Sequence, residues 1–319
     1  MPPGAAAHSV VDDLYFKNII SNRFLFNLLI KIRRHGPNFK AGDYVFRAGT
    51  TLSTLLTQLQ TGSGLVYHTL IIVPGWTMRQ VRAALMDNPY LTHTIDKMSD
   101  ALLMASVGVP GVSPEGRFFP DTYYFSTHAP DISLLKRSAK AMQDKMNFAW
   151  KGRLTDLPFK NETELLIAAS LIEKETGLDV ERPIIAGVIL NRLKANILLQ
   201  FDPTVIYGMG NQYTGTIHKA DLLRKTPYNT YTMKGLPPTP IAIPSMESLM
   251  AAAHPAQHAY LYFVARGDAS HQFSETLAEH NKAVGRLRNL MPAFFNYTMI
   301  RSRLSAVLFL GSYQVNKNK

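Results

Sequence analysis

The feature that most constrains the fold is an uncharged helical run near the middle of the sequence. Residues 165–172, LLIAASLI, carry no charge and lead directly into two glutamates, Glu173 and Glu175. Asn161 is a favourable N-cap residue just before the run. Residues 161–194 therefore predict a helical hairpin whose first helix is buried.

The two glutamates lie on different faces of this helix. Leu166, Ala169 and Glu173 are spaced by three and four residues, so Glu173 extends an apolar stripe. Glu175 lies about 200° further around the axis and is not expected to serve the same pocket. A carboxyl against apolar surface favours its protonated form, because desolvation disfavours the anion. A general acid needs that form near neutral pH, so Glu173 is a candidate acid.

The alternative is that Glu173 forms an ion pair with Arg182 or Arg192 of the second helix, and the spacing alone favours this structural role. The stretches LLQFDPTVIYG and YNTYTMKGLPPTPI favour chemistry instead, because they interleave aromatic rings with amides and carboxylates. Rings can cover the apolar face of a sugar while polar groups bind its hydroxyls. A role in the core and in turns is the alternative for these residues too. The candidates are Gln200, Asp202, Tyr207, Tyr228, Asn229 and Tyr231.

The rest of the sequence alternates short strands with helices, which predicts an α+β fold. Helices are expected over residues 14–34, 51–62, 77–88, 131–150, 245–253 and 274–290. Strands are expected over residues 40–49, 66–76, 121–125 and 260–265. A length of 319 residues suggests two domains, or one large and one small.

Composition excludes several kinds of site. There is no cysteine, which excludes disulfides, a thiol nucleophile and a cysteine metal site. No zinc-ligand motif, phosphate loop or dinucleotide motif is present. The sequence therefore predicts neither a metal nor a cofactor.

The formal net charge of +11 is unevenly distributed. No Asp or Glu follows Glu279, and the seven Lys and Arg residues beyond it leave only +4 for the preceding 279 residues. A basic tail can bind an anionic membrane or polymer as well as nucleic acid, and no nucleic-acid motif accompanies it. No uninterrupted run of about 18 apolar residues is present, as a membrane span needs. The N-terminus lacks the pattern of a signal peptide.

Seven stretches between about residue 18 and residue 290 occur in the order of one known family. They are FKAGDYVF, PEGRFFPDTYYF, ASLIEKETGLDVERPIIAGVILNRL, LLQFDPTVIYGMG, PYNTYTMKGLPPTPIAIP, AAAHPAQHAYLYFVA and HQFSETLAEHNKAV. The combination of EKET, NRL, Q-x-DPTVIYG, YNTY and GLPP is highly specific. The sequence resembles the endolytic murein transglycosylase family (MltG, YceG-like), and the match covers most of the chain.

The resemblance implies a domain order and a set of site residues. A LysM-like subdomain, incomplete at its N-terminus, is expected over residues 1–64, a catalytic α+β domain over 65–290 and a basic tail of no assigned role over 291–319. The first Glu of EKET, here Glu173, would be the catalytic acid and base. The cleft residues implied by the family's motifs are Gln200, Asp202, Thr204, Tyr228, Asn229 and Tyr231, with His271 and Asn281 as further candidates.

The resemblance also implies a substrate and a location. Members of the family cut nascent peptidoglycan strands internally and leave a 1,6-anhydro-N-acetylmuramic end. Peptidoglycan synthases are expected as partners, and the protein is expected at the periplasmic face of the bacterial inner membrane, with no nucleic acid bound. The family's N-terminal membrane helix is not found in this sequence, so we expect the parent protein to carry it. VPGW at residues 73–76 also lacks a Glu that the family has there.

Two alternatives stay open at this point. A hydrolase acting on the same glycan would use Glu173 as acid and Asp202 or Glu181 as the partner carboxylate. The other alternative is a catalytically idle scaffold that binds peptidoglycan. A carboxyl at an apolar face argues against it, because a protein that only binds has no need of one.

Overall fold

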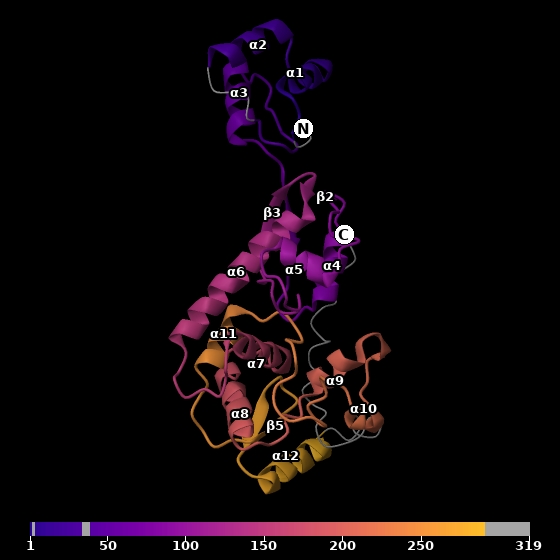
Figure 1. Ribbon diagram of the computed structural model, residues 1–319, viewed down its shortest axis with the longest axis vertical. Coiled ribbons are helices and arrows are strands. Elements are labelled where there is room, and N and C mark those ends of the chain that lie inside the picture. Colours follow the sequence, from indigo (N-terminus) through magenta and orange to yellow (C-terminus); the bar gives the residue numbers. More distant parts are fainter. Residues whose placement is uncertain (2–3, 34–38, 291–319) are drawn as a thin grey trace. The chain divides into compact units, whose positions relative to one another are not determined.

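The computed structural model describes residues 1, 4–33 and 39–290, which form two compact units (Figure 1). The first unit comprises Met1–Ile71, Arg82–Ser99 and Thr122–Lys136. The second comprises Ile72–Val81, Asp100–Asp121 and the chain from Arg137 onward. The LysM-like character predicted for residues 1–64 stays a prediction, and the predicted basic tail, residues 291–319, lies outside the described residues.

Three helices form the N-terminal part of the first unit. They are α1 (Ala7–Phe16), α2 (Arg23–Ile32) and α3 (Leu52–Thr61). The Asn22 side chain accepts hydrogen bonds from the backbone N–H groups of Phe24 and Leu25, at 2.9 and 3.2 Å, so α2 begins at Arg23. The single helix predicted over residues 14–34 is therefore wrong, because two helices share that stretch. The strand predicted over 40–49 is reduced to an isolated bridge between Tyr44 and Leu65.

Apolar side chains from these three helices form the core of this part. Phe26 of α2 is fully buried among them, and Gly62, at φ +81°, ends α3 in the left-handed conformation that glycine adopts readily. The buried core residues are Val10, Val11, Leu14, Ile20, Phe26, Leu55, Leu56 and Leu59.

Short strands complete the first unit. β1 (Tyr67–Ile71) pairs antiparallel with β3 (Thr122–Ser126), and β2 (Leu91–Thr92) pairs parallel with β4 (Ala129–Pro130). Two helices, α4 (Met78–Met86) and α6 (Asp131–Gly152), each contribute residues to both units.

The second unit is built around the predicted helical hairpin. α7 (Glu162–Glu175) is followed by α8 (Arg182–Lys194), and both pack against α11 (Met246–Ala253), as Figure 1 shows. Asn161 caps α7 by accepting a hydrogen bond from the N–H of Glu164 at 3.1 Å. Every residue of α7 from Leu165 to Glu173 is buried. The buried hairpin is therefore confirmed.

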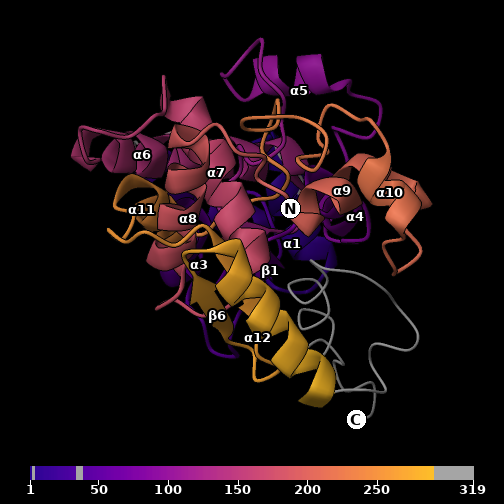
Figure 2. The same ribbon diagram turned by 90° about the horizontal axis from the view of Figure 1, so that it is seen from below.

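The remaining elements of the second unit surround this hairpin. They are α5 (Asp100–Ser106), α9 (Asp202–Met209), η1 (Gly210–Gln212), α10 (Lys219–Leu223), β5 (Tyr262–Ala265), β6 (His271–Ser274) and α12 (Leu277–Leu290). β5 and β6 form an antiparallel pair, against which α12 packs (Figure 2). Helices with small two-stranded sheets confirm the predicted α+β class. In the part of the chain that the structure describes, no helix combines the length and apolarity that crossing a membrane requires.

Candidate active site

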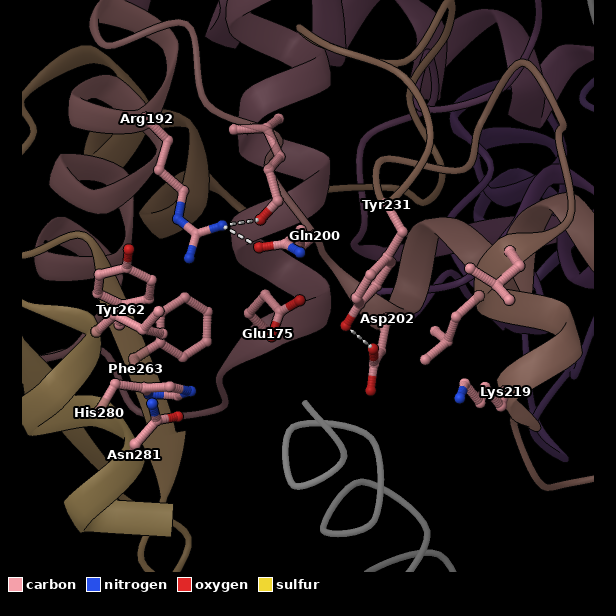
Figure 3. Close-up of a pocket in the computed structure, with 14 residues that line it drawn as sticks. Glu175, Arg192, Gln200, Asp202, Lys219, Tyr231, Tyr262, Phe263, His280 and Asn281 are labelled. Carbon is pink, nitrogen blue, oxygen red and sulfur yellow. Dashed lines mark hydrogen bonds between the residues drawn. The ribbon is translucent and has the colours of Figure 1, made fainter. Parts of the chain in front are cut away.

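The second unit contains a pocket of about 440 Å³ beside the end of α7 (Figure 3). Its walls come from α7, α8, α9, α10, β5, α12 and the loops that precede α9 and follow α10. The lining residues are Glu175, Arg192, Leu199, Gln200, Asp202, Lys219, Leu222, Leu223, Tyr231, Tyr262, Phe263, Leu277, His280 and Asn281.

The carboxylate that α7 presents to this pocket is that of Glu175. It is the last residue of the helix, because Thr176 has an extended backbone (φ −143°, ψ 141°) that ends the helical turn. Its side chain lines the pocket although the residue is only 3% exposed. Figure 3 shows Glu175 between Asp202 and Tyr231 on one side and Tyr262, with its neighbours, on the other. Glu175 is thus a buried carboxyl with access to a ligand-sized space.

Glu173 has a different environment. It is 4% exposed, and its Oε2 accepts a hydrogen bond from Arg182 Nη1 at 2.8 Å. The same oxygen accepts from the Ser245 N–H at 2.9 Å, from Ser245 Oγ at 2.6 Å and from Ser248 Oγ at 2.8 Å. These bonds join the end of α7 to the starts of α8 and α11. The structural alternative, an ion pair with Arg182, is confirmed.

The expectation that Glu175 cannot serve the cleft is wrong. The two glutamates do lie on opposite faces of α7, as the 200° separation requires. However, α7 is buried all round, so an apolar stripe does not identify which face adjoins the pocket. Glu173 does not line the pocket. The geometry therefore assigns the candidate acid to the second Glu of EKET.

A second carboxylate lies in the pocket and is held by a tyrosine. Asp202 begins α9, and its Oδ1 accepts a hydrogen bond from the Tyr231 hydroxyl at 2.5 Å. Asp202 is almost fully buried, and Figure 3 shows the bond on the pocket side. Both residues were predicted to line the cleft, and the structure places both there.

Arg192 fixes the opposite wall. Its Nη1 donates to the carbonyls of Leu198 and Leu199, at 2.8 and 3.0 Å, and to Gln200 Oε1 at 3.1 Å. Its Nε donates to the carbonyl of Leu261 at 2.6 Å. Burial lowers the pKa of the Arg192 guanidinium. With these acceptors, Arg192 sets the position of Gln200, a predicted cleft residue that does line the pocket.

Aromatic rings form the third wall. The rings of Tyr262 and His280 are stacked, with centroids 5.4 Å apart and planes inclined by 28°. The Arg192 guanidinium lies over the same Tyr262 ring, 5.1 Å from its centroid. Asn281, a predicted residue, follows His280 on α12 and also lines the pocket.

Thr204 and Asn229 were predicted to bind substrate, and neither lines the pocket. Thr204 is fully buried, and its Oγ1 is 2.9 Å from Thr230 Oγ1. Asn229 is also buried; its Nδ2 donates to three backbone carbonyls around the end of α10, and its Oδ1 accepts from the N–H of Tyr231 at 2.9 Å. Both are structural residues that hold the loop from which Tyr231 projects.

Tyr228 and His271 also lie away from the pocket lining. The Tyr228 hydroxyl is 2.9 Å from Thr239 Oγ1. His271 Nδ1 is 2.7 Å from Glu181 Oε2, and the backbone N–H of His271 donates to Glu181 Oε1 at 2.7 Å. Both carboxylate oxygens of Glu181 are thus within hydrogen-bond distance of His271. Glu181 does not line the pocket, as the partner carboxylate of a hydrolase would.

The sequence analysis missed several lining residues, chiefly Glu175, Arg192, Lys219, Tyr262, Phe263 and His280. YLYFVA was predicted as a strand, but successive side chains of a strand point to opposite faces, so this pattern did not predict that the adjacent residues Tyr262 and Phe263 both line the pocket. What could not be read from the sequence was that α12 and β5 fold back beside α7.

A further buried carboxyl, Glu115, lies outside this pocket lining and titrates near neutral pH. Its Oε1 accepts from the N–H of Met78 at 2.9 Å, and its Oε2 accepts from the Tyr207 hydroxyl at 3.1 Å. Burial raises its pKa from 4.5 to about 7, against the lowering effect of these hydrogen bonds, and Asp100 adds a small rise.

This pKa predicts a pH-dependent stability. Between about pH 4.5 and 7 the folded state binds more protons than the unfolded state, so the contribution of Glu115 to stability is lost as the pH rises through 7. The unfolding free energy of the wild type minus that of Glu115→Gln should fall by about 2–3 kcal/mol from pH 4.5 to pH 8. Denaturant unfolding of both proteins across this range measures it. A pH-independent difference would contradict the assignment.

This α+β protein therefore has a pocket with a buried carboxyl, a second carboxylate held by a tyrosine and an aromatic wall, which are groups that enzymes cleaving glycosidic bonds use. Residues 1–286 match the model of the YceG-like family. The chain is 32% identical over 302 residues to a Bacillus subtilis protein named endolytic murein transglycosylase, covering 89% of this chain and 82% of that protein. A Streptococcus pneumoniae protein of the same name is 26% identical over 83% of this chain and 53% of its own length.

The fold has a solved counterpart. A putative YceG-like protein of Listeria monocytogenes, known from a 2.6 Å crystal structure, superposes with a TM-score of 0.57 at 28% identity. The comparison covers 88% of this chain and 96% of that one. The chain belongs to the YceG-like family.

Proposed function

We propose that this chain is an endolytic lytic transglycosylase of peptidoglycan, a lyase that cleaves the bond between N-acetylmuramic acid and N-acetylglucosamine within glycan strands. The observation that carries the proposal is the buried carboxyl of Glu175 in a pocket that also holds the Asp202–Tyr231 pair. The names of the Bacillus and Streptococcus relatives support it.

Glu175 acts first as the general acid. A buried carboxyl favours its protonated form because desolvation disfavours the anion, so Glu175 is suited to donate a proton to the bridging glycosidic oxygen. As the bond to the anomeric carbon breaks, that oxygen leaves as a hydroxyl of the departing strand. The N-acetyl carbonyl of the muramic residue stabilises the positive charge that develops at the anomeric carbon.

Glu175 then acts as the base. Now ionised, it takes the proton from the 6-hydroxyl of the same muramic residue, whose oxygen closes onto the anomeric carbon. The products are a 1,6-anhydro end and a free hydroxyl on the other fragment, and Glu175 is again protonated. Because the attacking oxygen belongs to the same sugar, the step is intramolecular, which gives it an advantage over attack by water.

The other lining groups position the sugar. Gln200, fixed by Arg192, and Asn281 offer amides for hydroxyl and N-acetyl groups. Tyr262 offers an aromatic ring for an apolar sugar face. Asp202, held by Tyr231, places a carboxylate near the forming positive charge.

Asp202 is also the observation that favours the alternative, hydrolysis of the same bond, because hydrolases usually need two carboxylates. The names of the relatives favour the transglycosylase.

Mass spectrometry of products formed from purified glycan in heavy-oxygen water separates the two reactions. The transglycosylase gives anhydromuramic ends, one water lighter than reducing ends and free of the label. Reducing muramic ends that carry the label would reassign the enzyme as a hydrolase.

We also place the protein at the periplasmic face of the inner membrane, working with peptidoglycan synthases. The support is the substrate: nascent strands are lipid-linked where the synthases make them. Fractionation of the native protein tests the location, and recovery of the full-length form from cytosol alone would refute it.

A further inference from the structure

The helices α1 and α2 present a row of apolar side chains to solvent. Seven large apolar residues between residues 15 and 32 are at least 37% exposed, with Phe16 and Phe24 above 70%. The other exposed large apolar residues in the described chain are spread from Val45 to Leu277. The α1–α2 face, as we call it, consists of Tyr15, Phe16, Ile19, Phe24, Leu25, Leu28 and Ile32.

The helix α2 is apolar on two sides. Phe26 is fully buried, and Leu29 and Ile30 pack with it in the core. The four exposed residues, Phe24, Leu25, Leu28 and Ile32, fall within an arc of about 100° on the other side of the helix. A second, exposed apolar side on a helix whose first apolar side is already buried is unfavourable in water, so this second side is expected to be covered in the functioning protein.

The same segment carries a net positive charge. Residues 12–43 contain six Lys and Arg residues and three Asp residues, Asp12, Asp13 and Asp43, which leaves a net charge of +3. Lys31 is exposed on α2 beside the apolar arc. Lys17 and Arg23 pair with Asp13 and Asp12 of α1, but these pairs are exposed and therefore weak. Apolar surface and positive charge thus occur together.

We propose that the α1–α2 face binds the surface of an anionic lipid bilayer. Its Phe and Leu side chains enter the boundary between headgroups and acyl chains, while the cations bind lipid phosphates. An anionic polymer in water would leave the apolar side chains exposed. A second copy docking by the same face would bring two segments of net positive charge together, which opposes a symmetric dimer. A bilayer satisfies both features, and the inference does not depend on the pocket.

Vesicle sedimentation of the full chain tests this. The variant Phe24→Ser with Ile32→Ser removes two exposed apolar groups, 73% and 66% exposed. The matched control, Phe148→Ser with Val180→Ser, removes two residues that are 63% and 78% exposed elsewhere. With vesicles of phosphatidylglycerol and phosphatidylcholine in equal parts, the α2 variant should bind at least about tenfold more weakly than wild type, and the control should bind like wild type.

Further measurements test the contribution of charge to binding and the folding of the α2 variant. Binding should weaken with added salt and on vesicles of phosphatidylcholine alone. Circular dichroism and cleavage of soluble glycan should be unchanged in the α2 variant, since neither residue touches the pocket. Equal binding by the α2 variant and the control, or no binding by the wild type, would overturn the proposal. So would light scattering that shows a dimer lost in the α2 variant, because the face would then be a self-interface.

Discussion

Replacing Glu175 with Gln is expected to slow strand cleavage by about 10³- to 10⁴-fold. The substitution removes the proton that Glu175 gives to the glycosidic oxygen and the base that later takes the 6-hydroxyl proton. General acid–base catalysis typically contributes about 10²- to 10⁴-fold, and here one group supplies both steps. Release of anhydromuramic ends from purified glycan measures the rate. Because Gln has the same shape, the free energy of unfolding should change by less than about 1 kcal/mol.

Glycan binding gives the control for this variant. Glu175→Gln should still bind glycan strands, since Gln200, Asp202 and the aromatic wall remain in place. A variant that cleaves at more than a tenth of the wild-type rate would show that Glu175 is not the acid.

Replacing Glu173 with Gln is expected to lower stability instead. Arg182 is buried, and the charge of Glu173 is its buried partner. Breaking a buried ion pair by removing one partner typically costs about 3–5 kcal/mol, because the other charge remains uncompensated. We expect a loss of about 3 kcal/mol, since Gln can still accept some of the hydrogen bonds from Ser245 and Ser248. Chemical denaturation measures it.

The second carboxylate that contacts Arg182, that of Asp179, provides a matched control. Arg182 Nε donates to Asp179 Oδ1 at 3.1 Å, but that carboxylate is largely exposed to solvent. Asp179→Asn should therefore cost at most about 1 kcal/mol. If the two substitutions lower stability equally, the buried network around Glu173 does not have the structural role that we assign to it.

The sequence predicted the elements whose signals are local. The N-cap at Asn161 and the uncharged run of α7 each act within a few residues, and the structure shows both. The break between α1 and α2 depends on the Asn22 cap, an equally local signal that the long apolar pattern of residues 14–34 obscured.

The site was predicted in part, for a physical reason. Gln200, Asp202 and Tyr231 were predicted because their motifs are specific, and Asn281 was a further candidate; all four line the pocket. Choosing between the two glutamates of EKET required knowing what packs on each face of α7. That depends on Ser245 and Ser248, more than seventy residues away in the sequence. Helical spacing separates the faces but does not say which one adjoins a pocket.

The most direct test of the account compares the cleavage rate per folded molecule of Glu175→Gln and Glu173→Gln on the same glycan. The folded fraction of each variant is taken from its own unfolding curve, and the assay is run where both are mostly folded. We predict that Glu173→Gln keeps most of the wild-type rate per folded molecule, while Glu175→Gln loses about three orders of magnitude. The reverse order, an inactive but folded Glu173→Gln beside an active Glu175→Gln, would contradict the assignment of the acid to the pocket carboxyl.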